Sequence, residues 1–140
     1  MQYQAVDTAS EFVCRLDHGA DWRAEVEGLA DDEDLDAAFF YGLGAVQDAE
    51  VWFYDQDRTE YDAVTFDEPL EVAACMGNVS WLDGERFAHT HAVLSRPDGA
   101  ALARHLTSAT VRAGERHGRG FDPHLEGTHD GPTALHRWEV

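Results

Sequence analysis

Apolar and polar residues alternate along much of this chain, and the alternation predicts a protein built mainly of β-strands. In residues 11–16 (EFVCRL), Phe12, Cys14 and Leu16 would share one face of a strand. The segment DQDR at residues 55–58 separates two aromatic-rich strands and predicts a hairpin turn. The predicted strands cover residues 11–16, 37–41, 45–54, 59–66, 70–76 with a continuation over 79–82, 87–94 and 110–115.

One main helix interrupts this pattern. Its apolar positions recur at helical spacing: Trp22, Val26 and Leu29. Asp21 is a suitable N-cap, so residues 22–30 are predicted to form a short amphipathic helix. Residues 100–106 (AALARHL) are composed mostly of helix formers and predict one or two further helical turns.

The two ends of the chain differ from its centre. Residues 1–10 are polar and are expected to fray or to form an edge of the structure. Glycine, histidine and proline dominate residues 116–140, which predicts irregular structure closed by a short apolar anchor around Leu135 and Trp138. No linker divides the chain, so residues 1–140 are predicted to form one α+β domain, a largely antiparallel β-sheet packed with one main helix.

The charge balance is strongly acidic. The chain has 28 acidic and 10 basic residues, a formal net charge of −18, and every basic residue is arginine. Such a surface repels itself less in molar salt, where the Debye length falls from about 8 Å to about 3 Å. These features predict a halophilic, cytoplasmic protein of a salt-accumulating organism.

The same charge disfavours direct binding to nucleic acid, because such binding depends on neutralising phosphates. Gly118-Arg119-Gly120 is similar to the centre of an AT-hook but lacks the flanking arginine and proline. Cys14 and Cys75 are isolated and predict reduced core residues. No signal peptide or membrane span is predicted, because no apolar run approaches 18 residues.

Candidate chemistry lies in the strand with the sequence HTH. His89 and His91 are two positions apart, so both side chains would lie on one face, about 6.5–7 Å apart along the strand. Three imidazoles and a water suit zinc, and His105 is the natural third ligand. The alternative is a pair of packed or surface histidines, because eight histidines in 140 residues produce about half a His-x-His pair by chance.

An ordered set of short motifs resembles one known family, the PPC domain (plants and prokaryotes conserved), which follows AT-hooks in plant nuclear proteins. The resemblance covers residues 11 to 115. The motifs are Arg15-Leu16-Asp17-His18-Gly19-Ala20-Asp21, Gly42-Leu43-Gly44-Ala45-Val46, Pro69-Leu70-Glu71, Gly77-Asn78, Asp83-Gly84 and His89-Thr90-His91.

The resemblance implies an α+β fold, a homotrimer and a zinc site formed by His89, His91 and His105. One departure concerns the third ligand. The family has two glycines before this histidine, and Ala103 and Arg104 replace them here. Either residue would be strained if the family's backbone needs positive φ at that position.

Three functions remain open at this point. The first is a non-catalytic, metal-binding domain with a regulatory or DNA-associated role, acting through a protein or small-molecule partner. The second is a zinc-dependent hydrolase or lyase that uses the three histidines, with Glu71 or Asp83 as general base. The third is direct DNA binding, which family analogy suggests and the net charge disfavours.

Overall fold

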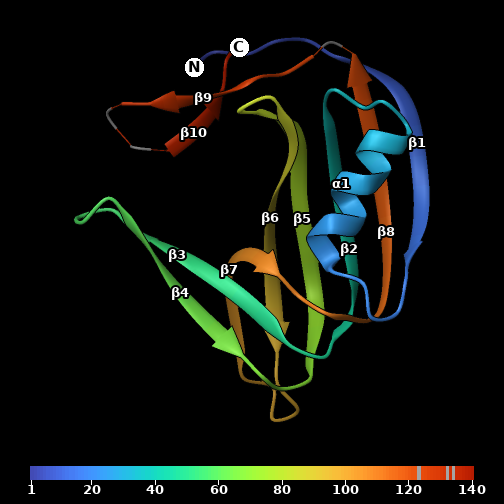
Figure 1. The fold of residues 1–140 in the computed structure, drawn as a ribbon, viewed down its shortest axis with the longest axis vertical. Helices are drawn as coiled ribbons and strands as arrows, with labels where there is room; N and C mark the ends of the chain where they lie inside the picture. Colours follow the sequence, from blue (N-terminus) through green and yellow to red (C-terminus); the bar gives the residue numbers. More distant parts are fainter. Residues whose placement is uncertain (123, 132, 134) are drawn as a thin grey trace.

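The computed structural model describes residues 1–122, 124–131, 133 and 135–140. An eight-stranded antiparallel sheet has the strand order β1-β8-β2-β5-β6-β7-β3-β4, and β9 and β10 form a small second sheet. In Figure 1 the helix α1 lies in front of β2 and β8, and the β3–β4 hairpin projects on the opposite side. The elements are β1 (Asp7–Leu16), α1 (Trp22–Asp32), β2 (Ala38–Val46), β3 (Ala49–Asp55), β4 (Glu60–Phe66), β5 (Leu70–Leu82), β6 (Glu85–Ser95), β7 (Ala101–Ser108), β8 (Val111–Asp122), β9 (Gly127–Asp130) and β10 (Leu135–Trp138).

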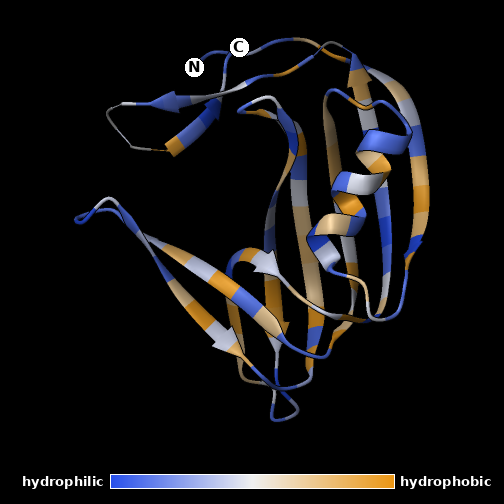
Figure 2. Ribbon diagram, viewed as in Figure 1, coloured by the Kyte–Doolittle hydropathy of each residue, from blue (hydrophilic) through white to orange (hydrophobic). Residues whose placement is uncertain are grey.

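The predicted helix is confirmed, and its N-cap explains where it begins. The Asp21 carboxylate accepts hydrogen bonds from the backbone N–H groups of Arg23 and Ala24, at 3.0 and 2.9 Å. Trp22, Val26 and Ala30 are buried and pack on the sheet, where they join the main core with residues such as Leu16 and Cys75. Apolar and polar segments alternate along the strands, as Figure 2 shows, so one face of the sheet can be buried on this helix.

Close approach between strands explains several glycines. A Cβ atom at Gly42 would lie 2.6 Å from the Glu115 carbonyl oxygen, and one at Gly44 would lie 2.2 Å from that of Ala113. The backbones of β2 and β8 therefore approach closely at this pair of glycines. Gly77, predicted to interrupt its strand, instead lies within the continuous strand β5, opposite Thr90.

The helical turns predicted for residues 100–106 are wrong, because this segment forms the strand β7. Residues Ala101 to His105 pair with Ser95 to His91 of β6. Alanine, leucine and arginine are good helix formers, but intrinsic helix propensity differs by less than about 1 kcal/mol per residue, and strand pairing with β6 outweighs it.

Residues from Asp7 onward form the edge strand β1, one of the two outcomes expected for the N-terminal segment, whereas the C-terminal segment is more ordered than predicted. β8 continues to Asp122 and pairs with β1 from Asp7 onward, so neither segment is irregular there. The apolar anchor lies in the β9–β10 hairpin. Pro123, Pro132 and Ala134, which belong to the stretch predicted to be irregular, lie outside the described residues. The strand predicted over residues 45–54 is divided between β2 and β3 at Gln47 and Asp48, where Asp48 accepts a hydrogen bond from the Thr110 N–H.

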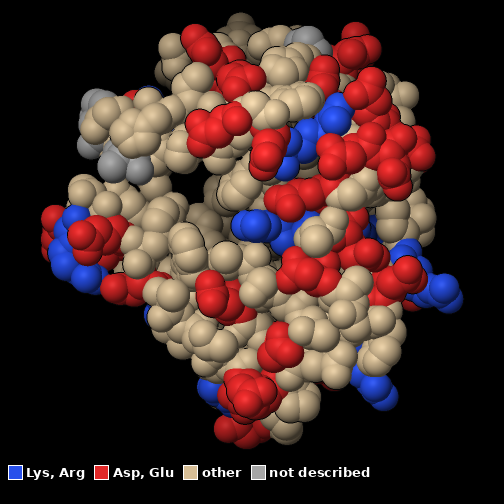
Figure 3. All heavy atoms as spheres, viewed as in Figure 1, with Lys and Arg blue, Asp and Glu red and all other residues tan. Residues whose placement is uncertain are grey.

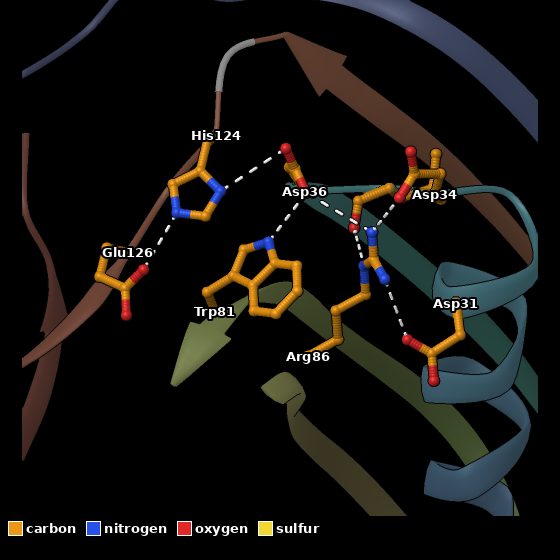
Figure 4. A network of polar contacts seen from close by, with 8 residues as sticks. Asp31, Asp34, Asp36, Trp81, Arg86, His124 and Glu126 are labelled. Carbon is orange, nitrogen blue, oxygen red and sulfur yellow. Dashed lines mark hydrogen bonds and ion pairs between the residues drawn. The ribbon is translucent and has the colours of Figure 1, made fainter. Parts of the chain in front are cut away.

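A polar network attaches α1 and the C-terminal segment to the sheet (Figure 4). Arg86 of β6 donates to the Leu35 carbonyl at 2.7 Å, and its guanidinium pairs with Asp31 at 3.1 Å and Asp34 at 2.6 Å. The Trp81 indole N–H donates to Asp36 at 2.8 Å. One arginine thus organises several carboxylates at the end of the helix.

Acidic side chains spread over much of the face drawn in Figure 3, in keeping with the net charge of −18. Cys14 and Cys75 are free thiols, and burial raises the pKa of Cys75 to about 11. Within the described residues, α1 is too short to cross a bilayer.

Candidate metal centre

The strand register brings the three candidate histidines together. His91 of β6 lies directly opposite His105 of β7. His89 is two residues before His91, so its side chain shares the same face of the sheet. The sequence predicted the shared face of His89 and His91. The pairing with His105 depends on β7 being a strand, which the sequence did not predict.

The ring nitrogens of this cluster face one another. His89 Nε2 lies 3.1 Å from His105 Nδ1 and 3.3 Å from His91 Nε2. One nitrogen from each of the three rings lies within 4.8 Å of the other two. A neutral imidazole carries one N–H, so His89 Nε2 faces two nitrogens with at most one proton of its own. A cation between the three nitrogens would remove the resulting repulsion between lone pairs.

The electrostatic environment favours neutral rings. Burial and the two neighbouring imidazoles lower the pKa of His105 to about 4. Desolvation also lowers the pKa of His91, and desolvation together with His91 lowers that of His89. His89 and His91 are exposed as whole residues, and His105 is half-buried. Neutral imidazole is the form that binds metal.

Ala103 and Arg104 do not distort the backbone before His105. The non-glycine residues with positive φ in the described part of the chain are Asp34, Thr59 and Asp83. Ala103 pairs with Val93 in the regular ladder, and the Arg104 guanidinium lies 4.9 Å from the centre of the Phe53 ring. The strain considered for a glycine-dependent loop is therefore absent.

Aromatic residues of the β3–β4 hairpin surround the outer side of the cluster. Trp52 pairs across the ladder with His105. The Tyr61 ring meets His105 edge to face, with ring centres 5.5 Å apart. The sequence predicted the aromatic-rich hairpin that carries these rings. Their contact with the histidines could not be inferred because it depends on β3 pairing with β7.

Neither proposed general base lies at the cluster. Glu71 pairs with Ser95, four residues along β6 from His91. Asp83 lies in the turn between β5 and β6, six residues from His89. At about 3.3 Å per residue both are more than 10 Å away along the strands. Of the histidines in the described residues, none beyond these three joins the metal-compatible group.

The fold and the cluster define a class of protein: a curled antiparallel sheet with one helix and three convergent histidines on neighbouring strands. The profile of the Plants and Prokaryotes Conserved (PCC) domain matches residues 3–115, and the chain belongs to this family. The family predicted from the sequence motifs is thus confirmed, as is the mostly antiparallel sheet with one small helix.

Three solved structures illustrate the similarity. A metal-containing protein of Archaeoglobus fulgidus has 33% identity and a TM-score of 0.95 over 100% of both chains. A plant- and prokaryote-conserved protein of Pyrococcus horikoshii has 21% identity and a TM-score of 0.92, over 100% of this chain and 98% of its own. A protein of Ralstonia eutropha described as a candidate DNA-binding protein has 26% identity and a TM-score of 0.81, over 91% and 90%. Comparison with curated proteins gives no significant match.

Proposed function

We propose that this protein is a non-catalytic, metal-binding homotrimer whose His89, His91 and His105 hold a divalent transition metal, most suitably zinc. The observation that carries the proposal is the nitrogen geometry. Zn–N bonds of 2.0–2.1 Å in a tetrahedron place the nitrogens about 3.3–3.4 Å apart. The two nitrogen separations at His89 are 3.1 and 3.3 Å. Metal in the similar A. fulgidus protein supports the same conclusion.

The donor set narrows the choice of metal. Three imidazoles with no carboxylate or thiolate suit zinc, copper, iron or nickel better than magnesium or calcium, which prefer oxygen ligands. Zinc accepts this set in tetrahedral geometry with water as the fourth ligand. Two of the three nitrogen separations already lie near the required spacing, and the third is within 4.8 Å, so the rings would need only small movements to bind the ion.

Elemental mass spectrometry of untagged protein, purified without chelator, tests the assignment. We expect close to one zinc per chain, and its loss in His91→Ala. The matched control is His18→Ala, which removes an exposed imidazole bonded to the Arg112 carbonyl, remote in sequence from the cluster. A His91→Ala protein with unchanged metal content would refute the site.

An exposed apolar surface supports the homotrimer. Its members, on neighbouring strands β1, β2 and β5, are Val13, Phe39, Tyr41, Leu43 and Met76, exposed by 87, 43, 55, 58 and 53%. The register places them on one face of the sheet, because Tyr41 lies opposite both His117 and Met76, and His117 lies opposite Val13. Copies of the chain could cover this surface.

Light scattering after size-exclusion chromatography tests the assembly. Three chains of 15.6 kDa would give about 47 kDa. Tyr41→Asp should yield a monomer, whereas Val64→Asp, on the edge strand β4, should not. A monomeric parent protein would contradict the trimer directly.

A regulatory or DNA-associated role is proposed to act through a partner. Ten arginines against 28 acidic residues make direct phosphate binding unfavourable. A gel-shift assay at physiological and molar salt tests this point, and tight sequence-specific retention would refute it. A hydrolase or lyase that uses Glu71 or Asp83 as general base is disfavoured, because the described lining of the cavity beside the histidines contains neither residue and no other carboxylate.

A further inference from the structure

A cavity of about 600 Å³ opens beside the histidine cluster. It lies between the β3–β4 hairpin, the β9–β10 hairpin and β6, and Figure 3 shows the hollow on this face. Its volume falls in the range of small-molecule sites, roughly 300–1,000 Å³. The cavity can therefore enclose a molecule of one or two rings.

The composition of its wall contrasts with the rest of the chain. One residue in five is acidic, so the nineteen described lining residues would carry about four carboxylates by composition alone. None of the nineteen is Asp or Glu, and two, Arg23 and Arg137, are arginines. The cavity is thus a carboxylate-free surface on a protein of net charge −18.

Both arginines keep donors for a ligand. Arg23 Nε lies 3.3 Å from Glu27, and its guanidinium lies over the Phe87 ring at 5.4 Å. Arg137 pairs through Nη2 with Asp130. A guanidinium has five N–H donors, so each arginine can bind an anionic oxygen while it keeps its ion pair with Glu27 or Asp130.

Aromatic rings form another part of the wall. The Tyr61 ring centre lies 5.5 Å from that of Trp52 and 5.0 Å from that of Tyr54. The Tyr54 hydroxyl donates to the Thr133 carbonyl at 2.6 Å and so joins the two hairpins at the rim. Tilted rings at these distances offer faces and edges on which a planar molecule can stack.

We propose that this cavity binds a small aromatic anion, with its ring against the Trp52, Tyr54 and Tyr61 wall and its anionic group paired with Arg23 and Arg137. This inference goes beyond the proposed metal site, because the arginines and aromatic rings act without the histidine cluster. His91, moreover, does not line the cavity, whereas His89 and His105 do.

Isothermal titration calorimetry with two matched probes, 2-naphthoate and 2-naphthylmethylammonium, tests the inference at 0.15 M KCl. The net charge of −18 attracts the cation and repels the anion, so a preference for naphthoate must come from the cavity itself. We expect naphthoate to bind at least tenfold more tightly than the ammonium probe. Equal affinities, tighter binding of the cation, or no binding of naphthoate would each overturn the proposal.

Substitutions then locate the binding. Arg137→Gln and Arg23→Gln should each weaken naphthoate binding by about tenfold, the usual cost of losing a charged hydrogen bond. Arg58→Gln is the control, because Arg58 pairs with Asp55 and Asp62 away from the cavity. Circular dichroism identifies any variant that fails to fold. If both cavity variants fold and bind as tightly as the parent, the inference is wrong.

A third variant separates this proposal from the metal site. His91→Ala removes one proposed metal ligand but leaves the cavity lining intact. We expect it to retain naphthoate affinity even as its metal content falls. Loss of naphthoate binding in folded His91→Ala protein would place the anion on the metal and overturn the role of the arginines. Failure of the metal site alone would leave this affinity unchanged.

Discussion

Gly77→Ala should destabilise the protein and disturb the histidine cluster through one added methyl group. A Cβ atom at Gly77 would lie 2.3 Å from the His89 carbonyl oxygen and 2.5 Å from Cζ of Phe40, whereas ordinary contact begins at 3.4 Å. The β5 and β6 strands would have to separate by about 1 Å near His89, or Phe40 would have to leave its rotamer.

The magnitude follows from these contacts. Overpacking a core costs about 1–3 kcal/mol, and weakening one or two ladder hydrogen bonds adds about 1 kcal/mol each. We expect a loss of about 2–5 kcal/mol in the free energy of unfolding. Metal content should fall as well, because metal–ligand distances tolerate only about 0.2 Å of displacement.

Urea unfolding at a fixed protein concentration measures the first effect, and elemental mass spectrometry measures the second. The matched control is Gly28→Ala in α1, where an added Cβ would have no atom within 4 Å. This change should stabilise the protein by about 0.5–1 kcal/mol, because alanine favours the helix interior. A Gly77→Ala protein as stable and as rich in metal as the parent would refute the reasoning.

Three further predictions concern pH, the polar network and salt. The folded state lowers the pKa of His105 to about 4 from its usual 6.5. Metal-free protein should therefore lose about 1–2 kcal/mol of stability as the pH falls from 6.5 to 4, a figure that allows for the partial exposure of His105. In urea unfolding at several pH values, His105→Gln should reduce this dependence of stability on pH. Arg86→Gln should lower the free energy of unfolding, measured in urea, by about 2–3 kcal/mol, because the Leu35 carbonyl and two aspartates lose a charged donor. Arg58→Gln, at an exposed ion pair, should lower it by less than about 1 kcal/mol. Thermal stability should rise from low to molar KCl as repulsion among 28 acidic residues is screened, and a steady decline would exclude halophilic adaptation.

The features that the sequence predicts well are local. Asp21 begins the helix through its own side chain, and the HTH motif puts two imidazoles on one face because strands alternate. The features it misses depend on partners distant in the chain. Ala101–Ser108 is a strand because β6 and β3 flank it, and the last part of β8 is ordered because β1 pairs with it. The third histidine reaches the cluster through the first of these pairings.

The two halves of β6 differ in how many neighbouring strands pair with them. From His91 to Ser95 it has ladder partners on both sides, but from Glu85 to Thr90 its ladder partner is β5 alone. Amide protons of the one-sided half should therefore exchange with solvent sooner than those of the two-sided half. His89 lies on the part of β6 whose hydrogen bonds should open more readily, and His91 lies on the part that is paired on both sides. An ion bound by both histidines would therefore cross-link the two parts of the strand. Occupancy of the site would then slow the local opening of β6 near His89, and amide exchange could report the bound state without any catalytic assay.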